Sequence, residues 1–221
     1  MARGFSRQGK GEKVRYAARL DEMERGLVAG LMEQVRDIIA TAEQPVPLDP
    51  RPEANAETEF DAIVAGLGAI GQGVSLAGAD QDPPLPGPGG TRDPALSRLL
   101  PTGHRHDEKA AAEFRAMTEQ SLIRRKIDNL TLAMDALRRG ADQGHPDRVV
   151  LRPAQATAVL LALTDVRLVL ADRLGIATEA EAEAMHEILR TGHPNDPRVP
   201  AAAIYDFLSW LQESLSLALL P

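Results

Sequence analysis

Apolar residues recur every three or four positions along most of the chain, the spacing that places them on one face of an α-helix. Leu27, Leu31, Val35 and Ile38 show this spacing directly after Asp21, a residue type that caps helix N-termini. A weaker helical pattern covers residues 56–76. The clear patterns predict helices over 22–42, 94–100, 107–139, 153–174, 179–191 and 200–219.

Two short segments depart from the helical pattern and read as β-strands. Residues 14–20 and 148–151 each lead directly into a predicted helix. At an offset of 131 residues, Leu20 falls on Leu151, and the apolar positions of the helix at 22–42 fall on those of the helix at 153–174. Chance also produces such similarity between two apolar helices. We expect the two strands to pair as a two-stranded ribbon on a helical bundle.

Proline and glycine interrupt this organisation in one region. Residues 44–52 contain four prolines, and residues 77–92 contain four prolines and four glycines. Such a composition predicts a disordered or mobile connection. We therefore expect a mostly α-helical single domain over 14–221, interrupted by a linker-like insertion at 44–92 and preceded by a basic flexible arm at 1–13.

Charge is distributed unevenly along the chain. The net charge is −7, yet residues 1–19 contain six basic residues and one acid, Glu12. Such an arm suits nucleic acid or an acidic partner, or is simply solvated. Because the rest of the chain is acidic and repels phosphate, we do not expect direct binding to nucleic acid. The six basic residues are Arg3, Arg7, Lys10, Lys13, Arg15 and Arg19.

Several classes of protein are excluded or disfavoured by composition. The chain contains no cysteine, so it has no disulfide, no thiolate nucleophile and no cysteine-ligated metal. No secretory signal pattern opens the sequence. The most apolar predicted helix is interrupted by Asp165 and Arg167, which argues against a membrane span. We expect a cytoplasmic protein.

The stretch Gly66-Leu-Gly-Ala-Ile-Gly71 matches the glycine fingerprint of dinucleotide-binding enzymes. That fingerprint works only between a strand and a helix of a βαβ unit, where the backbone approaches pyrophosphate closely. Here the preceding residues are more helical than extended, and the Pro/Gly-rich run at 77–92 leaves no room for the following helix. We expect no dinucleotide site.

A His-x-His pattern at His104 and His106 invites a metal hypothesis. A metal site needs three or four converging ligands, and none is indicated here. Asp107 and Glu108 are accounted for by the start of a helix, where acids interact favourably with the helix dipole. The sequence also lacks a nucleophile elbow and a phosphate-binding loop. We expect no metal, no cofactor and no enzymatic activity.

Charged residues within helices present two different cases. The basic run Arg124-Arg-Lys126 shares its helix with Asp128 and Asp135, which favours a solvated, ion-paired face. Asp165 and Arg167 instead lie in the most apolar helix, where charges need partners. We expect these partners within the fold, the alternative being an interaction surface for another protein.

Three blocks of sequence resemble an actinobacterial domain-of-unknown-function family that includes the oxidative-stress regulator AosR. They are 93–101 with Glu113-Phe114-Arg115, 163–174, and 205–208 with 211–212; Tyr16-Ala-Ala-Arg-Leu20 also fits. The resemblance covers nearly the whole chain outside 44–92. The candidate structural or interaction residues that it indicates are Asp165, Arg167, Arg173, Glu113, Phe114 and Arg115.

The resemblance implies a non-enzymatic cytoplasmic regulator that binds a protein partner, a sigma factor or another part of the transcription machinery, in oxidative-stress or cysteine-metabolism gene control. AosR is understood to sense oxidation through a cysteine pair, which this chain lacks, so no redox switch carries over. Two alternatives stay open: a structural or adaptor protein without a transcriptional role, and an enzyme with a nicotinamide or metal cofactor.

Overall fold

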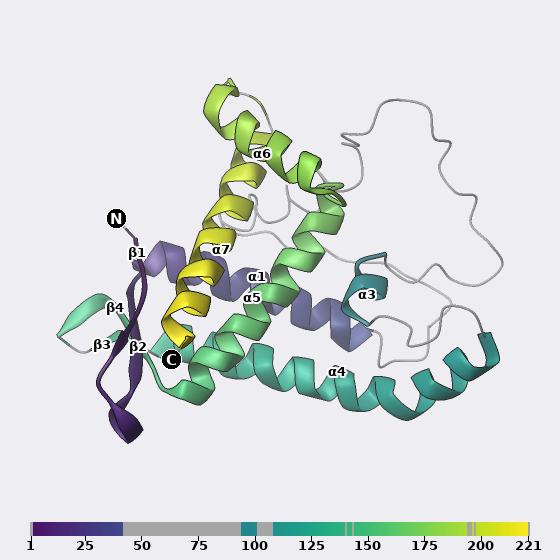
Figure 1. The fold of residues 1–221 in the computed structure, drawn as a ribbon, viewed down its shortest axis with the longest axis horizontal. Coiled ribbons are helices and arrows are strands. Elements are labelled where there is room, and N and C mark those ends of the chain that lie inside the picture. The colour runs from purple at the N-terminus through teal and green to yellow at the C-terminus, as the bar shows by residue number, and fades with distance from the viewer. Residues whose placement is uncertain are drawn as a thin grey trace, which may run out of the picture.

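Six described helices lie beside a small sheet at one end of the molecule (Figure 1). The computed structural model describes residues 2–41, 94–100, 108–139, 141–142, 144–193, 196 and 198–220, with only the backbone described at 108–118 and 141–142. The predicted insertion at 44–92 and weak helix at 56–76 lie outside these residues. The helices are α1 (Glu22–Thr41), α3 (Pro94–Leu99), α4 (Glu108–Arg139), α5 (Pro153–Arg173), α6 (Glu179–Thr191) and α7 (Arg198–Leu219). Of these, α5 and α7 contact the sheet.

The predicted helices are confirmed, with ends that differ by at most two residues. The largest difference is at α7, which begins at Arg198 instead of residue 200 and contains Pro200 in its first turn. Proline is tolerated there because the first N–H groups of a helix have no partner within the helix. Asp196 caps this end, since its Oδ1 accepts a hydrogen bond of 2.9 Å from the backbone N–H of Arg198.

An antiparallel sheet of four strands replaces the expected two-stranded ribbon. Its order is β1 (Arg3–Gln8), β2 (Arg15–Arg19), β4 (His145–Leu151) and β3 (Ala141–Asp142). The predicted pairing of the two strand segments is confirmed, with Tyr16 opposite Leu151. The additional strands β1 and β3 each form a hairpin with a predicted strand.

The expectation of a flexible N-terminal arm is wrong for Arg3–Gln8, because these residues form β1 and pair with β2. Phe5 is buried in the core, and its backbone N–H donates a 3.1 Å hydrogen bond to Ser214 Oγ on α7. Gly9 adopts φ +78° in the turn that follows, a conformation that glycine enters without steric cost. The burial of Phe5, the packing of β1 against α7 and the pairing with β2 thus anchor a basic segment.

The chain repeats one structural unit around the middle of the sheet. A hairpin followed by a helix occurs twice, as β1–β2–α1 and as β3–β4–α5, and β2 pairs with β4 at the centre. The sequence offset of 131 residues carries Ala18 onto Val149, and these two residues lie opposite each other in the β2–β4 register. The offset therefore maps this residue pair onto itself, as a local two-fold relation between the antiparallel strands β2 and β4 would.

Helix α5 is the central helix of the fold. It contacts α1, α3, α4 and α7, and it crosses the middle of the molecule in Figure 1. By length and composition alone it is the one described helix apolar enough to span a membrane, but more than half of its most apolar stretch is buried within the protein. A core helix meets the same criterion, and α5 occupies that position here.

Candidate functional site

Asp165 is the one buried charged residue among those the structure describes, and Lys126 is its partner. The Nζ of Lys126 on α4 lies 2.5 Å from Oδ1 of Asp165, with side-chain exposures of 18% and 7%. The sequence pattern predicts a solvated face for Lys126 together with Arg124 and Arg125. That prediction is correct for the two arginines, which are exposed, and wrong for Lys126.

Burial dominates the electrostatics of Asp165. Removal of the carboxylate from water raises its pKa, while the hydrogen bond and the charge of Lys126 lower it less strongly. The ion pair therefore compensates only part of the cost of burying the charge. The pair joins α4 to α5, and we expect it to favour one packing of these two helices.

Arg167 is partnered within the fold, as expected, but by neutral groups of α7. Its Nη1 donates to Gln212 Oε1 at 2.8 Å, and its guanidinium lies 5.3 Å from the centre of the Tyr205 ring. Gln212 in turn donates to Thr164 Oγ1 at 3.1 Å. The Nε of Arg167 is buried and has no hydrogen-bond partner in the described residues. The network joins α5 to α7 and brings together the second and third blocks of the family resemblance.

The end of α5 is held by α3. Arg98 Nε lies 2.9 Å from Asp172 Oδ1, and its Nη1 donates to the carbonyl of Ile176. Gly175 at φ +68° closes the helix, and the Ile176 N–H reaches back to the Ala171 carbonyl. Arg173 lies half-buried in this last turn. The first and second blocks of the family resemblance therefore also meet, through a structural contact.

Several of the predicted site residues have side chains that lie outside the described part of the structure. Glu113, Phe114 and Arg115 lie in α4 where only the backbone is described, and the glycine fingerprint at 66–71 and the His104–His106 pattern lie outside the described residues. Within the described residues, no group of three His, Asp or Glu side chains is arranged to hold a metal ion.

Helix α7 presents exposed apolar side chains that sequence analysis did not single out. Trp210 is 38% exposed and Leu217 62% exposed, and Leu220 follows them directly after the helix. The Trp210 ring also contacts Phe207, with 6.0 Å between ring centres. Beside this surface runs β1, since Ser214 binds Phe5 and Arg7 Nη1 donates to the carbonyl of Leu220. Large exposed apolar side chains next to arginines are typical of protein-binding surfaces.

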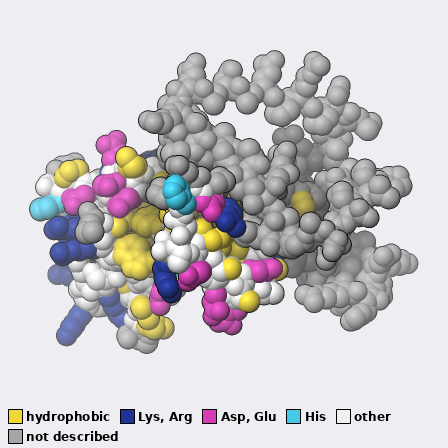
Figure 2. Space-filling view, turned by 90° about the horizontal axis from the view of Figure 1, so that it is seen from above, with side chains coloured by type: hydrophobic (Ala, Val, Ile, Leu, Met, Phe, Trp, Pro, Cys, Tyr) yellow, Lys and Arg dark blue, Asp and Glu magenta, His cyan; other side chains and the backbone are white. Residues whose placement is uncertain are grey.

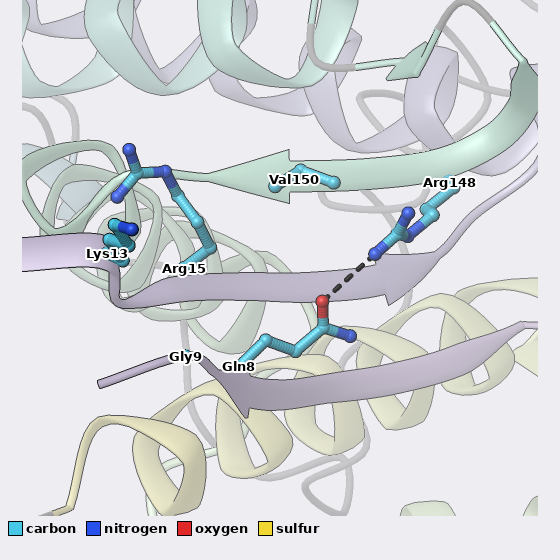
Figure 3. A pocket seen from close by; sticks show the side chains of 6 residues that line it. All are labelled: Gln8, Gly9, Lys13, Arg15, Arg148 and Val150. Atoms are coloured by element: carbon cyan, nitrogen blue, oxygen red, sulfur yellow. Dashed lines mark hydrogen bonds between the residues drawn. The ribbon is translucent and has the colours of Figure 1, made fainter.

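Basic side chains gather at the end of the molecule that holds the sheet (Figures 1 and 2). A hollow of about 490 Å³ lies over β1, β2 and β4 and is lined by Lys13, Arg15 and Arg148 among others. Figure 3 shows Lys13 and Arg15 side by side and Arg148 directed at Gln8, whose Oε1 accepts a 2.9 Å hydrogen bond from Arg148 Nη2. The basic arm of the sequence has become part of a folded, positively charged surface.

Comparison with known proteins assigns the chain to a family. The model of one family, described as a domain of unknown function (DUF2017), matches residues 2–219. Neither the curated proteins nor the solved structures contain a match. The expected resemblance to a domain-of-unknown-function family is thereby confirmed over nearly the full length.

Proposed function

This chain belongs to the family of the domain of unknown function DUF2017, and from that premise we propose that it is a non-enzymatic cytoplasmic regulator resembling AosR. It acts by binding another protein, a sigma factor or another component of the transcription machinery, in oxidative-stress or cysteine-metabolism gene control. Because the chain has no cysteine, it acts without a thiol switch.

The surface of α7 is the observation that carries the protein-binding part of this proposal. Trp210 and Leu217 remain exposed on a helix that packs on α5, and β1 runs beside their exposed surface. Burial of such side chains against a partner supplies apolar contact area, and tryptophan is the residue type most enriched at the energetic centres of interfaces. The candidate residue Arg167 supports this surface from within, because it binds Gln212 of α7, whereas Asp165 pairs with Lys126 of α4.

Affinity capture from native lysate with variants of α7 tests the proposal. We expect the wild-type protein to retain a sigma factor or RNA polymerase, identified by mass spectrometry, and the variants Trp210→Ala and Leu217→Ser to lose it. Met23→Ala is the matched control, because Met23 is also a large exposed apolar side chain, at 79%, but lies at the start of α1. A melting curve for each variant confirms that it is folded.

The alternative results discriminate between classes of function. Capture of a metabolic enzyme or a protease without any transcription protein would favour a structural or adaptor role. If Met23→Ala lost the partner to the same extent as the α7 variants, α7 would not be the specific binding surface. If the wild-type protein retained no transcription protein, the proposal would be contradicted.

A further inference from the structure

We infer that the outer face of the sheet is a docking surface for an acidic segment of a protein partner. This face is distinct from the apolar surface of α7, and the inference rests on the proposed function only in that the ligand is a protein. Along β2 the core-facing residues Tyr16 and Ala18 alternate with Arg15, Ala17 and Arg19. The outer face is thus defined by Arg15 and Arg19 and by their neighbours in register.

Three arginines form one row across this face. Arg3 of β1 lies opposite Arg19 of β2, and Arg19 lies opposite Arg148 of β4. Side chains opposite each other in an antiparallel pair share a face, and like charges in such positions destabilise the sheet. Repulsion among these arginines lowers the stability of the isolated protein. Such a cost is expected at a site where a negatively charged ligand neutralises the arginines on binding.

Among the described residues that line the hollows of this face, the one carboxylate is Asp135, and it already pairs with Arg139. Arg3, Lys13, Arg15, Arg19 and Arg152 have no carboxylate partner within the described part of the chain. The Nη1 of Arg15, for example, donates only to the backbone carbonyls of Glu12 and Val14. Elsewhere, basic side chains pair with acids of this chain, namely Arg36, Arg98, Lys126, Arg138, Arg139, Arg190 and Arg198.

The face is also hollowed where a segment would lie. The hollow of about 490 Å³ over the strands adjoins a second of about 430 Å³ between the sheet and the C-terminal part of α4. Arg15 and Val150 line both, so the two form one depression. Arg152 and the exposed Leu132 extend it, which adds one charge and one apolar contact.

The dimensions of the row favour an acidic helix over nucleic acid. Neighbouring strands are about 4.8 Å apart, so three arginines span about 10 Å. Acidic side chains at positions i and i+4 of a helix are about 5–6 Å apart and match this spacing. Nucleic acid running beyond the sheet would meet the acidic remainder of a chain whose net charge is −7. The aromatic side chain of β2, Tyr16, faces the core and offers the outer face no platform for base stacking.

Fluorescence anisotropy with defined probes tests the inference. One probe is an alanine-rich helical peptide with glutamates at i, i+4 and i+8; its counterpart has glutamine at those positions. Single-stranded and duplex DNA of similar length are the nucleic-acid probes. We expect binding of the glutamate peptide that weakens as salt is added, weak or no binding of the other probes, and about a tenfold loss of affinity in Arg19→Glu.

Arg124→Glu is the matched control, since Arg124 is an exposed arginine of α4 that lies outside the sheet, and it should bind like wild type. Arg19→Glu should also raise the melting temperature of the free protein, because it removes like-charge repulsion from the row. Tighter binding of DNA than of the glutamate peptide would overturn the inference, as would equal losses in both variants or an unaltered affinity in Arg19→Glu. Peptide binding without capture of a transcription protein would leave this inference standing and the proposed function contradicted.

Discussion

Lys126 on α4 and Asp165 on α5 form an ion pair with 2.5 Å between Nζ and Oδ1 at a largely buried contact between the two helices. Loss of one partner leaves the other charge without compensation in a poorly solvated position. We therefore expect Lys126→Met to lower the free energy of unfolding by about 3 kcal/mol, measured by urea denaturation.

The exposed neighbour Arg125 supplies the control, and Arg125→Met should change the free energy of unfolding by no more than about 0.5 kcal/mol. The double variant Lys126→Met/Asp165→Leu should recover most of the loss, because it removes both charges together. Equal free energies of unfolding for Lys126→Met and Arg125→Met would show that the Lys126–Asp165 pair contributes nothing to stability.

The pH dependence of stability should carry the signature of Asp165. Burial raises the pKa of this carboxyl above its usual value of 3.8. The folded protein then holds a proton that the unfolded chain has released, so this contribution to stability is complete below pH 3.8 and is lost as pH rises through the folded pKa. The stability advantage of wild type over Asp165→Asn should therefore fall with rising pH from about 4 upwards. Urea titrations at a series of pH values measure it, and a constant or increasing difference would refute the assignment.

Gly4 is required by the close packing of β1 against α7. A Cβ at this position would lie 2.6 Å from Ser214 Cβ and 3.3 Å from the Trp210 ring. We expect Gly4→Ala to destabilise the protein by about 1–3 kcal/mol because β1 must shift. In Gly26→Ala on α1 the new methyl group meets no atom within 4 Å, and we expect a stabilisation of about 0.5–1 kcal/mol from the better helix propensity. Thermal melting of both variants measures these two effects. A lower melting temperature in Gly26→Ala, or an unchanged one in Gly4→Ala, would contradict the prediction.

Partner binding should not respond to thiol oxidants applied to this protein. Disulfides and sulfenic acids need cysteine sulfur, and the chain has none. Binding curves to the captured partner should coincide after this protein alone is treated with diamide and then with dithiothreitol. A reversible shift, observed with the partner's own cysteines blocked, would disprove the argument.

The helices and the central strand pairing were predictable because their signals are local. Asp21 caps α1 as predicted, and its cap is completed by Glu24 only three residues away. The β2–β4 pair followed from two strand segments placed before similar helices. Each of these predictions needed only neighbouring residues or a simple repeat.

The features missed by sequence analysis depend on partners distant in the chain. β1 contains one large apolar residue, Phe5, among arginines, so nothing local distinguishes it from a solvated arm; the turn glycines Gly9 and Gly11 were the available signal. Lys126 looked like its exposed neighbours because its partner Asp165 lies on another helix. The arginine row is likewise invisible until the register of three strands is known.

The two-fold arrangement at Ala18 and Val149 has a consequence for folding. The hairpins β1–β2 and β3–β4 and their contacts with adjacent helices are local, whereas the β2–β4 pair closes a loop of 131 residues. Non-local pairing of this kind slows folding, so we expect assembly of the two halves to limit the rate. The entropy of loop closure grows only with the logarithm of length, by about 0.6 kcal/mol for each doubling. Insertions or deletions between α1 and α3 should therefore change both the folding rate and the stability of the central strand pair only slightly.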